Sequence, residues 1–230
     1  MTTTKRGHAI NGDLFTLRHQ PDDGLPALDL DAPFTSFIDV SFRGTTHQAF
    51  SAADRAAFSY ANATGQFSVG DYQGHILETL DHVETQVSHR YQALVDTPAG
   101  VLSAHSYDSV DELLSLIGAL RPAATALGLT LNPDDEVEYT TAARVAIELS
   151  IGVVEITPLT SEVIDQLPAW QGTSVAGGDL YGGRFTDDSA YLTLITPTCR
   201  VLALPGATHD EDHVAGVLAG LQATWQKTTI

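Results

Sequence analysis

The chain has 230 residues, of which 43% are hydrophobic and 17% charged, a balance typical of a folded globular protein. Its 11 basic and 29 acidic side chains give a net charge of −18, which works against binding to nucleic acid or to an anionic membrane surface. No apolar run approaches the roughly 20 residues of a membrane-spanning helix, and residues 1–13 lack the apolar stretch of a secretory signal. The single cysteine, Cys199, cannot form an internal disulfide, so we expect a cytoplasmic protein.

Two stretches in the chain are nearly the same. Residues 95–102 read VDTPAGVL and residues 195–202 read ITPTCRVL, each with a Thr-Pro pair between apolar runs and a helical pattern downstream. The flanking residues match at an offset of 100, and further matches upstream keep the same order at offsets of 108 to 112. This series predicts an internal duplication. We therefore expect an N-terminal arm (1–27), a first repeat (28–127) and a second repeat (128–230), together one structural domain.

Each repeat has the same predicted order of elements. A strand with alternating apolar residues comes first, then a helix capped by Ser51 or Thr160, then a glycine-punctuated hairpin, two strands joined at the Thr-Pro turn, and a closing helix. The segments in question are 37–42, 51–61, 65–77, 89–106 and 108–120 in the first repeat, and 145–151, 160–170, 173–185, 190–204 and 209–221 in the second. The sequence thus predicts an α+β fold, with two β-α-β-β-β-α repeats sharing a largely antiparallel sheet about a pseudo-two-fold axis.

Catalytic and metal-binding patterns are weak. His209 and His213 in HDEDH have the i, i+4 spacing of zinc ligands, but the segment coincides with an expected helix start, where acidic residues suit the helix dipole. The glycines of 175–185 lack the spacing of a phosphate-binding loop, and the apolar neighbours of Cys199 indicate a buried thiol. We predict no catalytic residue, no cofactor and no metal, although a site assembled from distant Asp, Glu or His residues stays open.

The arrangement of strand, DTPAG turn, strand and DELLSLIGAL helix resembles the actinobacterial EspG family, the cytosolic chaperones of type VII (ESX) secretion. Its second-half turn is matched by Thr196 and Arg200, with Cys199 where a glycine is expected, and the first half has Asp96, Thr97 and Gly100. The resemblance covers residues 28 to 225. It implies a non-enzymatic chaperone or adaptor that binds an apolar tip of a helical, secreted partner.

Two other classes of function stay open. One is a small-molecule-binding or enzymatic α+β protein with its pocket at the repeat junction, and the other is a structural subunit of a larger, phage-like assembly. For the chaperone, the acidic surface would maintain solubility while an apolar patch is exposed. Three aromatic residues near the shorter second hairpin, Trp170, Tyr181 and Phe185, are the predicted partner-binding patch. The sequence leaves the oligomeric state and the partner's identity open.

Overall fold

The computed structural model describes residues 2–21, 27–83, 86–106, 109–167, 172–207 and 209–228, with the backbone alone described for 81–83 and 86–88. The chain divides into two compact units, each built on antiparallel strands. Unit 1 comprises residues 1–7, 13–34 and 144–230, and unit 2 comprises residues 8–12 and 35–143. Within the described ranges, every helix is too short or too polar to cross a bilayer.

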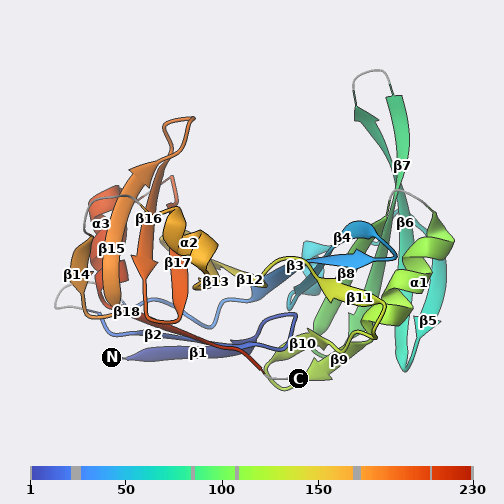
Figure 1. Cartoon of the computed structure of the whole chain (residues 1–230), viewed down its shortest axis with the longest axis horizontal. Coiled ribbons are helices and arrows are strands. Elements are labelled where there is room, and N and C mark those ends of the chain that lie inside the picture. The colour runs from blue at the N-terminus through green and yellow to red at the C-terminus, as the bar shows by residue number, and fades with distance from the viewer. Residues whose placement is uncertain are drawn as a thin grey trace. The chain divides into compact units, whose positions relative to one another are not determined.

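Unit 2 is an antiparallel sheet with the strand order β3-β4-β8-β7-β6-β5 (Figure 1). In chain order these strands are β3 (Phe34–Phe42), β4 (Thr45–Ala52), β5 (Ala63–Val69), β6 (Tyr72–Val83), β7 (Gln86–Thr97) and β8 (Gly100–Ser106). Smaller elements complete the unit: a 3₁₀ turn η1 (Arg55–Ala57), β9 (Pro122–Thr125) paired with β10 (Gly128–Leu131), and β11 (Val137–Tyr139) paired with β3.

Helix α1 (Val110–Leu120) closes one face of this sheet. The Ser109 side chain caps it by accepting the N–H of Glu112, and Asp111 and Glu112 in the first turn suit the positive end of the helix dipole. Its apolar side packs on β7 and β8, burying Leu113, Leu116, Ile117 and Leu120. The opposite face of the sheet has no such helix within the described ranges.

Unit 1 has the sheet order β14-β15-β16-β17-β13-β12. These strands are β12 (Arg144–Leu149), β13 (Gly152–Pro158), β14 (Thr173–Val175), β15 (Gly178–Arg184), β16 (Ala190–Ile195) and β17 (Cys199–Pro205). Helix α2 (Ser161–Asp165) follows β13, and α3 (Glu211–Ala219) packs on β15, β16 and β17. A second sheet joins β1 (Thr3–His8), β2 (Leu14–His19) and β18 (Leu221–Gln226).

The predicted α+β class with antiparallel sheet is confirmed, but several elements were wrong. Each repeat was expected to enter a helix directly after its first strand, whereas a hairpin partner, β4 or β13, comes first. Ser51 therefore lies in β4 and caps nothing; Asp54 caps the short η1 turn instead, while Thr160 caps α2 as expected. The last helix was predicted to run to residue 221, but it ends before Gly220 and is followed by β18.

The two Thr-Pro turns share one local mechanism. The Thr97 hydroxyl donates to the Gly100 carbonyl at 2.8 Å, and the Thr196 hydroxyl donates to the Cys199 carbonyl at 3.0 Å. The same contact recurs between Thr125 and Gly128 in the β9–β10 hairpin, so it is a general way of closing a tight turn. Thr97 corresponds to Thr196, so residues of the two turns match 99 positions apart in the sequence. The offset of 100 predicted for the flanking strands was therefore wrong by one residue. An error of one residue along a strand places each side chain on the opposite face of the sheet.

Candidate functional site

The sheet of unit 1 has one face under α3 and one face that is partly open. Leu194 and Val201 are register partners and are fully buried. Because side chains alternate along a strand, their neighbours point the other way. Tyr181 pairs with Thr193, and Thr193 pairs with Leu202, so these three side chains form a row on the open face.

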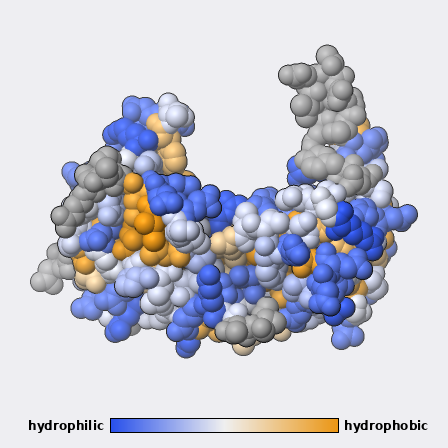
Figure 2. Space-filling view, viewed as in Figure 1, coloured by the Kyte–Doolittle hydropathy of each residue, from blue (hydrophilic) through white to orange (hydrophobic). Residues whose placement is uncertain are grey.

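A cavity of about 390 Å³ lies on this open face, and we call it the unit 1 pocket. Its wall combines aromatic rings with Val163 of α2 and with Leu167, two residues after that helix; the apolar lining residues are Tyr181, Phe185, Tyr191, Val163, Leu167 and Leu202. The rings of Phe185 and Tyr191 lie 4.8 Å apart between centroids, and Phe185 is 43% exposed. Hydrophobic surface gathers beside α2 in this unit (Figure 2).

Local sequence explains why this face stays partly open. Thr160 caps α2, which ends at Asp165, so the helix is too short to cover more than one end of the sheet. The β14–β15 hairpin packs tightly on its neighbour because Gly178 has φ +152, and a Cβ there would stand 1.9 Å from the Ile195 carbonyl oxygen. The aromatic side chains therefore project from closely packed strands next to a short cover.

Two arginines supply the charge in the described lining of the unit 1 pocket. Arg200 on β17 contacts Glu155 on β13 at 3.5 Å, with both side chains about three-quarters buried. Arg184 on β15 contacts Glu211 of α3 and donates to the Asp188 carbonyl at 2.8 Å. The carboxylates hold both guanidinium groups in place, so the lining of the pocket combines aromatic and apolar side chains with two paired arginines.

The predicted patch residues have different outcomes. Tyr181 and Phe185 lie together in the unit 1 pocket. Trp170 lies outside the described residues. Tyr191 was missed, although its position near the start of a predicted strand would have placed it beside the hairpin had the strand pairing been known.

The other candidates of the sequence form no evident site. The rings of His209 and His213 stack at 4.9 Å, and Asp210 caps α3 by accepting the N–H of His213. Nowhere in the described ranges do three or more His, Cys, Asp or Glu side chains come together as metal ligands. Cys199 is buried, as expected, and burial raises the pKa of its thiol.

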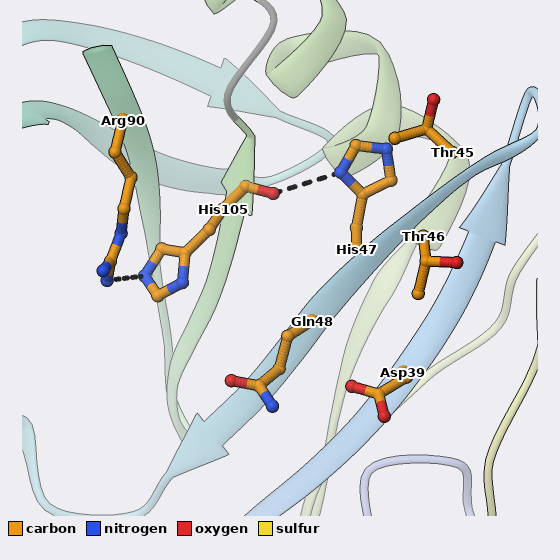
Figure 3. A pocket seen from close by; sticks show the side chains of 7 residues that line it. All are labelled: Asp39, Thr45, Thr46, His47, Gln48, Arg90 and His105. Carbon is orange, nitrogen blue, oxygen red and sulfur yellow. Dashed lines mark hydrogen bonds between the residues drawn. The ribbon is translucent and has the colours of Figure 1, made fainter. Parts of the chain in front are cut away.

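Unit 2 contains a polar cavity of about 430 Å³ that the sequence did not indicate (Figure 3). The β4–β8 ladder stops at the pair Ala49 and Ala104, so the strands part beyond it. His47 fills the gap, since its Nδ1 donates to the His105 backbone carbonyl at 3.2 Å, in place of a ladder hydrogen bond. Arg90 donates to Nε2 of His105 at 3.3 Å.

No family model, curated protein or solved structure matches the chain.

Proposed function

We propose that this protein is a non-enzymatic chaperone or adaptor that binds an apolar tip of a helical protein partner at the unit 1 pocket. The observation that carries the proposal is a set of half-buried aromatic rings on a sheet face that α2 covers at one end only. Aromatic side chains in a partly enclosed pocket provide most of the affinity at protein interfaces. The resemblance to the EspG family supports a type VII secretion substrate as the partner, bound in the cytoplasm.

The size of the pocket fits a few anchoring side chains. Burying apolar surface contributes about 25 cal/mol per Å², so one or two Leu or Phe side chains would supply several kcal/mol before the cost of association. The net charge of −18 keeps the chaperone soluble while the pocket is empty of its partner.

The strand orders support an internal duplication. The order β3-β4-β8-β7-β6-β5 of unit 2 corresponds element by element to β12-β13-β17-β16-β15-β14 of unit 1. In both units a short helical turn follows the second strand and a longer helix follows the sixth. The shared sheet and the pseudo-two-fold axis stay predictions.

A pull-down from native lysate with a double variant tests the proposed function. Tyr181→Ala with Phe185→Ala should abolish partner capture, while stability falls by only about 1–2 kcal/mol because both rings are partly exposed. Leu80→Ala is the matched control, since Leu80 is an exposed apolar side chain of unit 2 (53%) and its loss should leave capture intact. A folded double variant that captures the partner as well as the parent protein would place the binding face elsewhere.

A further inference from the structure

Residues 53–62 connect β4 to β5 over the face of the unit 2 sheet that α1 leaves uncovered, and we call them the strap. They join no ladder of the described sheet, and most of their side chains are exposed. Their backbone hydrogen bonds are local, because Ala57, Phe58 and Ala63 each donate an N–H to a carbonyl three residues earlier. Side chains therefore hold the strap to the sheet.

Two half-buried aromatic rings of the strap pack on the sheet. Phe58 stacks on Phe50 of β4 at 5.5 Å between centroids. The Tyr60 ring lies edge-on to the His75 ring of β6 at 5.1 Å. Both aromatic residues of the strap pack on one apolar cluster, which consists of Leu77, Leu94 and Val101. The side chains of this cluster are at most 9% exposed, so the strap shields them from water on this face.

One carboxylate holds both ends of the strap. The Tyr60 hydroxyl donates to Asp96 Oδ1 at 3.0 Å, and Arg55 Nε lies 3.7 Å from the same oxygen. A terminal nitrogen of Arg55 also donates to the Thr97 carbonyl at 3.0 Å. On the sheet, Nε2 of His75 lies 3.8 Å from Asp96 Oδ2. Hydrogen bonds to a charged acceptor are stronger than neutral ones, so Asp96 is the latch of this segment.

The strap covers this face without filling it. A cavity of about 360 Å³ is lined by Ala57, Phe58, Ser59 and Asn62 of the strap together with Leu77 and Leu94 of the sheet. Protein interiors are close-packed, and side chains beside an unfilled space lose part of their dispersion contacts. Few buried contacts and local backbone hydrogen bonds are the features of a segment that opens without global unfolding.

The covered face corresponds to the face that carries the unit 1 pocket. The row Tyr181, Thr193 and Leu202 of unit 1 has its counterpart in His75, Leu94 and Ser103 of unit 2, with the same strand pairings. The second and third members of the two rows match at the offset of 99 that relates the turns. In unit 1 the row lies beside an accessible pocket, whereas in unit 2 aromatic residues of the chain itself pack upon it.

We propose that the strap is a releasable cover. Latched at Asp96, it hides the cluster of Leu77, Leu94 and Val101, and its opening exposes that cluster while the rest of unit 2 stays folded. Unit 2 thus switches between a closed form and an open form that presents an apolar row like that of unit 1. This device does not depend on partner binding at the unit 1 pocket.

Thiol labelling at two buried positions measures the opening. Val101→Cys places a thiol under the strap, whereas Val95→Cys places one on the opposite face, under α1. The two valines are equally buried, at 0% exposure, so the pair is matched. Native protein is treated with iodoacetamide, and peptide masses distinguish the new thiol from that of Cys199. We expect Val101→Cys to be labelled about tenfold faster than Val95→Cys, or more.

Removing the latch should speed labelling under the strap alone. In the Val101→Cys protein, Asp96→Asn should raise the labelling rate about tenfold, because it removes the charge that holds Arg55 and Tyr60. Asp135→Asn removes an exposed carboxylate elsewhere in unit 2 and should leave the rate unchanged.

Tyr60→Phe guards against an Asp96 variant that is destabilised as a whole, which faster labelling of Val95→Cys would reveal. It keeps the ring and removes one contact of the latch, so it should raise the rate for Val101→Cys about threefold. Equal rates for Val101→Cys and Val95→Cys would overturn the proposal. A rate for Val101→Cys that neither Asp96→Asn nor Tyr60→Phe changes would overturn it as well.

Discussion

The substitution of Gly100 by alanine tests the close packing of the β7–β8 hairpin on β4. Gly100 has φ +133, and a Cβ at this position would stand 2.4 Å from the backbone oxygen of Ala52. Positive φ costs a non-glycine residue about 1–2 kcal/mol, and forcing the neighbouring backbone aside costs about 1–3 kcal/mol more. Gly100→Ala should therefore lower the free energy of unfolding by about 2–5 kcal/mol, the sum of those two penalties.

Gly118 offers a matched control in the same unit. It is an exposed position inside α1, and a Cβ there would meet nothing within 4 Å. Gly118→Ala should therefore raise the free energy of unfolding by up to about 1 kcal/mol, since alanine is the better helix former. Urea unfolding followed by circular dichroism compares the two variants with the parent protein. A Gly100→Ala variant as stable as the parent would refute the close approach of the hairpin to β4.

Two further predictions concern titration and reactivity. Burial, with a hydrogen bond of 3.0 Å to Asp96 and the charge of that carboxylate, raises the pKa of Tyr60 to about 12. An unfolded tyrosine titrates near pH 10, as a rough reference value. The contribution of protonated Tyr60 to the free energy of unfolding should therefore be complete below that pH and decline as the pH rises toward about 12. Tyr60→Phe should remove this part of the alkaline decline in unfolding free energy, and an unchanged decline would contradict the assignment. Cys199 is fully buried and the pKa of its thiol is raised, so iodoacetamide should label it after unfolding in urea but not in the native protein. In a Gln222→Cys control variant, the new cysteine is exposed and should be labelled at once in the native protein.

The sequence allowed the antiparallel hairpins to be predicted because their turns carry local signals. Thr97 and Thr196 close two of them through the same hydroxyl contact, and α1 begins at Ser109 with acidic residues in its first turn. The strands β4 and β13 were missed: residues 45–50 and 152–158 were assigned to no element, and Ser51 and Ala52 were placed in the following helix. Local propensity gives no sign of which two distant strands pair.

The site was only partly predictable for the same reason. Tyr181 and Phe185 are close in sequence, so a patch could be expected from the hairpin alone. The polar cavity of unit 2 brings together Asp39, Gln48, Arg90 and His105 from four strands. Their common face follows from pairing registers, and a single sequence does not contain those registers in readable form.

Photo-crosslinking from position 185 tests the central claim most directly. The photoreactive residue p-benzoylphenylalanine replaces Phe185 in the unit 1 pocket, and in a control it replaces Gln222, which is exposed on β18. We predict a light-dependent adduct from position 185 in cells, with the crosslink on an apolar residue of a helical protein, and none from position 222. Equal adducts at both positions, or none at 185 from a folded protein, would contradict binding of a partner at this pocket.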